Sequence, residues 1–160
     1  MKGFAEIATV LDRNFLARSP FPASYRVASG QGLRVIKMWV GRWRRGVRVL
    51  ILEDDPLIAL DLQAILENDG HEVVSVCDSL AEARGHLEDG FDCALLDIDL
   101  VDGKSFGVAT VLMERHIPFA FVSASHPGEV PDTLRVASFI AKPFEEEAIL
   151  RSLEEVVPGG

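Results

Sequence analysis

The chain has 160 residues, of which 48% are hydrophobic, and its formal net charge is −9. This composition is sufficient for one domain with a buried core, and it excludes a chain that is disordered overall. The charge is unevenly divided, because residues 1–46 carry nine Lys or Arg side chains against two acidic ones, whereas residues 47–160 have a formal charge of −16. Such an acidic segment repels the DNA backbone, so we expect no direct DNA binding from it.

The sequence shows no pattern typical of membrane insertion or export. No apolar run approaches the roughly 18 residues that a spanning helix needs, and the first residues lack the layout of a signal peptide. Cys77 and Cys93 lie in apolar, strand-like contexts, which indicates two small buried side chains rather than a disulfide or a metal cluster. We therefore expect a protein of the reducing cytoplasm.

Residues 1–46 form a basic N-terminal extension with several open interpretations. Apolar residues at helical spacing predict an amphipathic helix over 3–17, and the Arg- and Trp-rich stretch 39–45 could contact a membrane surface or nucleic acid. The extension could equally neutralise the acidic domain or form a poorly ordered arm, and translation could start at Met38. The sequence does not choose between these alternatives.

From residue 47 onward, strands and helices alternate. Apolar runs predict five strands, at 47–52, 72–76, 93–97, 119–123 and 139–141. Helices are expected from Pro56 to just before Gly70, with Asp55 as the cap, and at 79–89, 105–115 and 145–156. Ser79 and Glu82 predict a capping box at the start of the second of these helices. The stretch 126–136 contains two prolines and a glycine, so any helix there is short. The pattern predicts an α/β domain over 47–157 with a doubly wound parallel sheet, followed by a tail at 158–160.

The apolar run from Cys93 to Leu100 is interrupted by a carboxylate, Asp97, at the end of the third strand. Ligands bind at the carboxyl edge of an open parallel sheet, so an acidic side chain at this position is well placed for chemistry. A lone aspartate at a strand end can also simply turn the chain. The interpretation therefore depends on what the other strand ends carry.

Three other strand ends carry polar side chains. Glu53 and Asp54 follow the first strand, Ser123 ends the fourth and Lys142 follows the fifth. In a sheet of order 2-1-3-4-5, strands one and three are neighbours, so their acids meet Asp97 and repel one another unless a cation such as Mg²⁺ binds among them. The pattern predicts phosphoryl transfer to Asp97, with positive charge from Lys142 and a hydroxyl donor from Ser123.

These segments resemble the receiver domains of two-component response regulators, over residues 47–157. The matching pieces are Val49–Pro56, Ala94–Leu100, Phe121–Ala124 and Phe139–Phe144. The resemblance implies a flavodoxin-like fold, a sensor histidine kinase or histidine phosphotransfer protein as phosphodonor, and an unidentified downstream protein target. The resemblance is also compatible with a homodimer.

The resemblance also implies a phosphoacceptor and a metal site. Asp97 would accept the phosphoryl group. Glu53 and Asp54 would organise Mg²⁺ together with Asp97, Asp54 more directly than Glu53, and the backbone carbonyl of Asp99 would complete the protein ligands. Asp99 would then contribute through its backbone rather than as a second catalytic carboxylate.

A switch is implied by the same resemblance. Ser123 would be the switch hydroxyl, Lys142 the lysine of the family motif, and Phe139 the aromatic residue that changes rotamer with Ser123. Because Phe139 has no hydroxyl, its movement would act through burial alone. Asp99 and Ser125 flank the site and are candidates for tuning hydrolysis of the phosphoryl group.

Several features depart from the usual receiver pattern. The intervals from Asp97 to Ser123 and from Ser123 to Lys142 are shorter than usual, which predicts a short fourth helix. Val101 stands where proline is common, and Gly103 comes early. The chain resembles stand-alone receivers of this kind, so we expect a single-domain response regulator that catalyses only its own phosphorylation and dephosphorylation and is not a turnover enzyme.

Two alternatives remain open from the residues themselves. Asp97-Ile98-Asp99 after a strand also fits a phosphatase of the haloacid dehalogenase type, although that family places the motif on its first strand and needs a longer chain beyond it. The domain could also be a binding module that keeps the fold and never carries a phosphoryl group.

Overall fold

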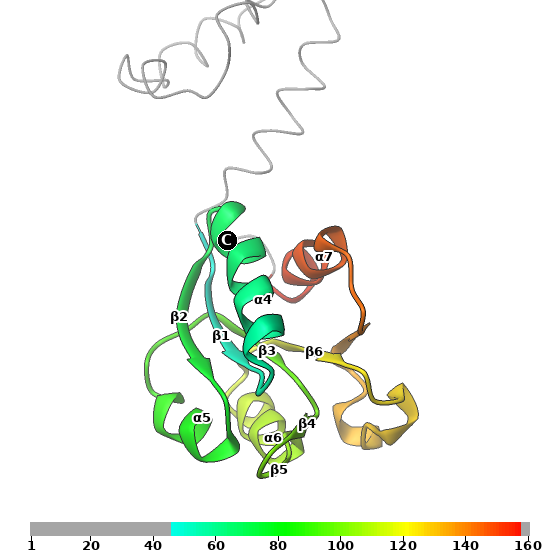
Figure 1. Cartoon of the computed structure of the whole chain (residues 1–160). Coiled ribbons are helices and arrows are strands. Elements are labelled where there is room, and N and C mark those ends of the chain that lie inside the picture. The colour runs from blue at the N-terminus through cyan, green and yellow to red at the C-terminus, as the bar shows by residue number, and fades with distance from the viewer. Residues whose placement is uncertain (1–45, 158–160) are drawn as a thin grey trace, which may run out of the picture. The chain divides into compact units, whose positions relative to one another are not determined.

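Five parallel strands form the centre of the structure, a computed structural model that describes residues 46–157 (Figure 1). The strands are β1 (Arg48–Leu52), β2 (Glu72–Cys77), β3 (Cys93–Leu96), β6 (Phe119–Ser123) and β7 (Ser138–Ala141). They lie in the order β2-β1-β3-β6-β7, which confirms the predicted doubly wound arrangement. The expectations for residues 1–45 and 158–160 lie outside the described residues.

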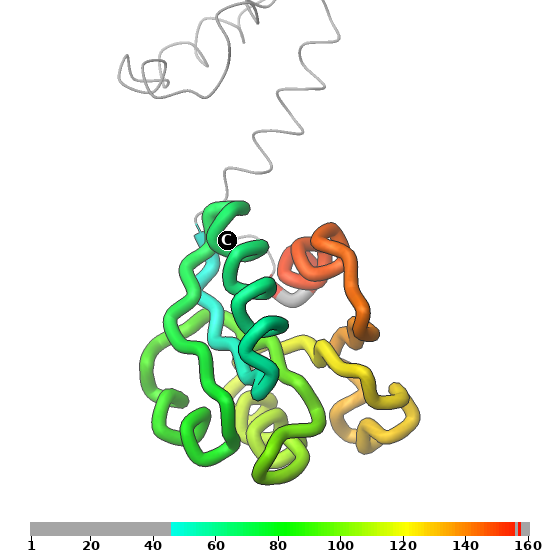
Figure 2. Tube along the Cα trace, viewed as in Figure 1, coloured from blue at the N-terminus to red at the C-terminus, as the bar shows by residue number. Residues whose placement is uncertain are grey.

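Four helices cover the two faces of this sheet (Figures 1 and 2). They are α4 (Pro56–Asn68), α5 (Leu80–His86), α6 (Phe106–Glu114) and α7 (Glu146–Val156). Side chains alternate along β1, so Val49 and Ile51 pack with α4 and α7, whereas Leu50 and Leu52 pack with α5 and α6. None of the helices in residues 46–157 is long and apolar enough to cross a membrane.

The ends of α4 follow the sequence prediction. The carboxylate of Asp55 accepts hydrogen bonds from the amides of Leu57 (2.9 Å) and Ile58 (3.2 Å), and Pro56 takes the first helical position. Beyond the end of the helix, Gly70 has a φ of +90°, a conformation that glycine adopts without strain. Asp55 is therefore a helix cap, as predicted.

The capping of α5 differs from the prediction. Ser79 accepts the amide of Glu82 (3.4 Å), but the Glu82 carboxylate accepts the amide of Asp78 (2.9 Å), one residue before the cap. The helix ends at His86 rather than near Asp89, because the Asp89 carboxylate binds the His86 ring and the chain turns there.

Two short 3-10 turns replace a regular helix between β6 and β7. These are η1 (Pro127–Glu129) and η2 (Asp132–Leu134), which confirms the predicted short fourth helix. Val130 and Leu134 are buried and pack into the same core cluster as Phe119 and Phe121. Next to β6, two side chains of this loop therefore pack where a regular fourth helix would present its face.

A small hairpin after β3 was not predicted. It pairs β4 (Asp99–Leu100) with β5 (Gly103–Lys104) in antiparallel register. Asp102 in the turn accepts the amides of Leu80 (2.9 Å) and Ala81 (3.1 Å), which fixes the hairpin to the start of α5. Strands of two residues are too short to show an alternating pattern, although Asp-Gly is a common turn signal.

Candidate functional site

The register of the sheet brings four strand ends together. Leu52 pairs with Leu96, Leu96 with Phe121, and Phe121 with Phe139, so these residues form one row across the sheet. The chain continues from this row into the predicted site residues at the carboxyl edge. Backbone hydrogen bonds from Asp97 to Leu52 (2.8 Å) and from Lys142 to Ser123 (3.0 Å) extend the pairing beyond the strands.

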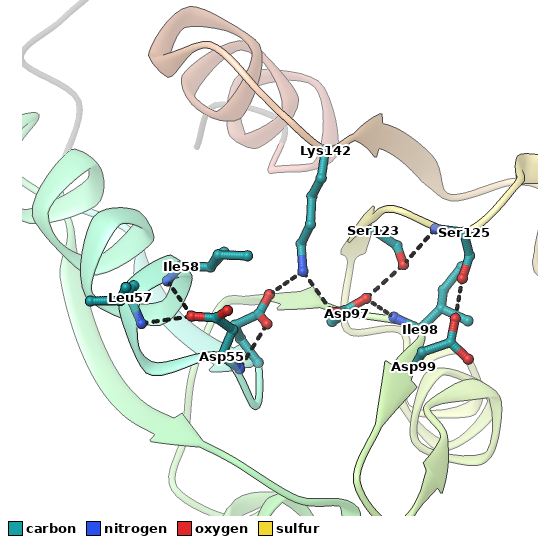
Figure 3. Close-up of polar contacts among 10 residues, drawn as sticks. Asp55, Leu57, Ile58, Asp97, Ile98, Asp99, Ser123, Ser125 and Lys142 are labelled. Atoms are coloured by element: carbon teal, nitrogen blue, oxygen red, sulfur yellow. Dashed lines mark hydrogen bonds and ion pairs between the residues drawn. The ribbon is translucent and has the colours of Figure 1, made fainter.

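Asp97 is held through both of its carboxylate oxygens. Lys142 Nζ lies 2.6 Å from Oδ2, while the hydroxyl of Ser123 and the amide of Ile98 each donate to Oδ1 at 2.6 Å (Figure 3). Asp97 is 8% exposed and Ser123 is 1% exposed. The peptide bond between Lys142 and Pro143 is cis. Three donors are thus directed at a nearly buried carboxylate that still reaches the surface.

Three carboxylates form a compact cluster at this edge. Glu53, Asp54 and Asp97 each offer an oxygen atom within 4.8 Å of the others. Glu53 is buried, accepts the amide of Asp55 (3.1 Å) and lies 2.6 Å from Lys142 Nζ. Lys142 balances one of the three negative charges, which leaves an excess of two.

The surroundings shift the pKa values of the central pair. Burial raises the pKa of Glu53, although the hydrogen bonds from Lys142 and the Asp55 amide oppose this effect. Burial disfavours the charge on Lys142, but its hydrogen bonds to Asp97 and Glu53 outweigh it and raise the pKa of Lys142. The lysine therefore stays positively charged beside the two acids.

Asp99 lies beside the cluster but faces away from it. Ser125 Oγ donates to Asp99 Oδ2 (Figure 3), and Lys104 Nζ lies 2.5 Å from Asp99 Oδ1. The hydrogen bonds from Lys104 and Ser125 lower the pKa of Asp99. Lys104 also pairs with Glu129 of η1 at 2.9 Å. The side chain of Asp99 is thus part of a second polar group, outside the three-carboxylate cluster.

Phe139 is half-buried on β7, next to a surface pocket. The pocket has a volume of about 380 Å³, and Phe139 and Phe121 line it together with Pro127 and Val130. Space for a different ring position is therefore available beside Phe139.

The site contains the residues that the sequence singled out and two that it did not. Glu53, Asp54, Asp97, Ser123 and Lys142 meet at one edge of the sheet, and Ser125 contacts Asp99 as flanking residues should. Lys104 and Glu129 were missed, because an exposed lysine and glutamate have no distinguishing pattern in a charged sequence. The Asp102-Gly103 turn was the one signal that could have placed Lys104 near Asp99.

Comparison with known proteins identifies the family. A family model of the response regulator receiver domain matches residues 49–154. The chain belongs to this family. It is a receiver domain over that region, in agreement with the five-stranded sheet and with the resemblance noted in the sequence.

Individual relatives are similar over the same domain. Phyllosphere-induced regulator PhyR of Methylorubrum extorquens is 38% identical over 106 residues, which are 61% of this chain and 38% of that protein. The structure of PhyR from Brucella abortus matches with a TM-score of 0.64 at 27% identity, covering 79% of this chain and 55% of that one. The BeF3-activated conformation of SdrG from Pseudomonas melonis matches with a TM-score of 0.60 at 36% identity, covering 69% and 95%. The chain spans less than half the length of the curated relatives that it matches.

Proposed function

We propose that this receiver domain accepts a phosphoryl group on Asp97 from a phosphohistidine donor. An oxygen of Asp97 attacks phosphorus, the P–N bond breaks, and the imidazole nitrogen leaves with the electron pair. The donor would be a sensor histidine kinase or a histidine phosphotransfer protein. We expect the reaction to take place in the cytoplasm and the signal to pass to a further protein.

One observation carries this proposal: the nearly buried Asp97 carboxylate lies at the carboxyl edge of the sheet and is contacted by both a cation and a hydroxyl. Lys142 and Ser123 lie 2.6 Å from its two oxygens. After transfer, these donors are near the phosphoryl oxygens, where positive charge and hydrogen bonds stabilise the developing negative charge.

The carboxylate cluster fits Mg²⁺. Its donors are all oxygen atoms, and its excess of two negative charges matches a divalent cation. Glu53, Asp54 and Asp97 would hold the ion, with the backbone carbonyl of Asp99 as a further ligand. Bound there, Mg²⁺ would supply charge neutralisation for the phosphoryl oxygens.

Signalling would follow from a rearrangement around Ser123 and Phe139. The Ser123 hydroxyl would leave Asp97 for a phosphoryl oxygen, and Phe139 would turn further into the pocket that it lines with Phe121. Asp99 and Ser125 would tune the rate of hydrolysis. The relative SdrG has been solved in a BeF3-activated conformation, which supports a receiver that responds to a phosphoryl-like group.

A haloacid dehalogenase type of reaction is not supported. Asp97 follows β3, the third strand of the chain's α/β pattern, rather than the first, and Asp99 points to Ser125 and Lys104 instead of toward Asp97.

The domain division at residues 46 and 158 stays a prediction, as does the homodimer.

Labelling with a small phosphodonor tests the proposal. Phosphoramidate has a P–N bond like that of phosphohistidine, and with Mg²⁺ we expect it to phosphorylate the wild type but not Asp97→Asn. Asp61→Asn makes the same chemical change on the exposed surface of α4 and should be phosphorylated normally. Equal labelling of the wild type and Asp97→Asn would refute the assignment, and no labelling of either would favour a binding module.

A further inference from the structure

A series of polar contacts leads from Asp97 toward the η1 turn. Ser123 donates to Asp97 at 2.6 Å, and the amide of Ser125 donates to Ser123 Oγ at 3.3 Å. The hydroxyl of Ser125 then donates to Asp99. The contacts of the proposed phosphoacceptor thus extend to a side chain on the β4–β5 hairpin.

Lys104 extends this series to η1. Its Nζ lies 2.5 Å from Asp99 and 2.9 Å from Glu129, and Glu129 also accepts the amide of His126 at 3.3 Å, which caps η1. The side chains of Lys104, Asp99 and Glu129 are 44%, 54% and 47% exposed. Ion pairs with this exposure contribute little individually, so the bridge can break at small cost.

The two ends of this bridge belong to different parts of the fold. The hairpin that carries Lys104 is fixed to α5, because Asp102 accepts the amides of Leu80 and Ala81. Glu129 belongs to the loop after β6, the same loop that carries Ser125. A shift of that loop relative to the hairpin therefore changes the distance that Lys104 must span.

We propose that Lys104 is a positioning residue that holds η1 in the resting arrangement, and that phosphorylation of Asp97 loosens this bridge. The proposal rests on the proposed function and names how the site regulates a surface. A phosphoryl group offers Ser123 stronger acceptor oxygens than the carboxylate to which it is attached as an acyl phosphate. Ser125 is bonded to Ser123 through its amide and moves with it, and its hydroxyl gives up Asp99. The hairpin stays with α5, so Lys104 and Glu129 separate.

This bridge biases the equilibrium between resting and activated arrangements. A contact made only in the resting state lowers the population of the activated state and so weakens the binding of any ligand that requires it. Removing Lys104 should therefore strengthen the binding of a phosphoryl mimic, although Lys104 does not touch Asp97.

The experiment compares full-length wild type with Lys104→Met, titrated with beryllofluoride in the presence of Mg²⁺ and followed by amide NMR. We expect the apparent affinity of Lys104→Met for beryllofluoride to be about two- to five-fold higher. Without beryllofluoride, the Gly128 amide signal should already be displaced toward its activated position. An unchanged or weaker affinity, or a Gly128 signal at the wild-type resting position, would overturn the proposal.

Two control variants separate positioning from general stability. Lys104→Arg keeps the bridge and should restore wild-type affinity and signals. Arg115→Met removes an exposed ion pair with Glu88, outside this network, and should leave both unchanged. An effect of Arg115→Met equal to that of Lys104→Met would contradict the proposal. A wild type that neither binds beryllofluoride nor is labelled at Asp97 would instead refute the proposed function itself.

Discussion

Lys142 Nζ lies 2.6 Å from Asp97 Oδ2, although the two residues are 45 positions apart in the chain. The same nitrogen lies 2.6 Å from Glu53, so one lysine is shared by two nearly buried carboxylates. Any group added to Asp97 must enter this arrangement, and this explains why Lys142 is the residue whose removal should be most informative.

Lys142→Ala should lower the free energy of unfolding by about 3 kcal/mol in the absence of Mg²⁺, because it leaves two buried carboxylates without their cationic partner. Excess Mg²⁺ should recover part of this loss, since a bound cation replaces the missing charge and stabilises the folded state. Chemical denaturation with and without Mg²⁺ measures both effects. Arg115→Ala, which breaks an exposed pair with Glu88, serves as the control and should cost less than about 1 kcal/mol.

Lys142→Ala should also separate phosphorylation from its consequence. The variant keeps Asp97 and the carboxylate cluster, so we expect phosphoramidate to label it still. The shift of the Phe139 amide signal on phosphorylation should be lost, because we expect Lys142 to supply the charge that draws the phosphoryl group toward β7. A variant that is labelled and shows the full wild-type shift would contradict this prediction.

Glu53 should make stability depend on pH. Burial raises the pKa of Glu53 in the folded state above its ordinary value of 4.5. Between pH 4.5 and the folded-state pKa, the folded state therefore binds more protons than the unfolded state. Its contribution is therefore fully present below pH 4.5 and declines as the pH rises through the folded-state pKa. In denaturation without Mg²⁺, the free energy of unfolding of the wild type relative to Glu53→Gln should fall as the pH rises through this window. A difference that is flat or rises would be inconsistent with a raised pKa.

The two cysteines should be unreactive in the folded protein. Cys77 and Cys93 are fully buried free thiols, and burial raises the pKa of each to about 12. The thiolate is the reactive form, so a disulfide reagent at pH 8 should label neither cysteine before unfolding and both after it. Labelling of the native protein at the rate of a free thiol would show that the strands open more readily than the structure indicates.

The sequence by itself determined the five-stranded fold and the identity of the central polar residues. Short apolar runs, Pro56 and Gly70 at the ends of α4, and acids or a lysine directly after the strands are local features, and parallel strands place their carboxyl ends at one edge. The sequence alone therefore places Asp97 and Lys142 at the same edge of the sheet.

Only the tertiary structure decided which polar groups share partners. Lys142 is shared between Asp97 and Glu53, and the Asp99 side chain turns to Ser125 and Lys104 rather than to Asp97. These choices depend on side-chain directions and on contacts between segments far apart in the chain, which no local pattern encodes. The β4–β5 hairpin and the bridge from Lys104 to Glu129 were also not predictable from the sequence. Their strands and turns are too short to show a periodic hydrophobic pattern.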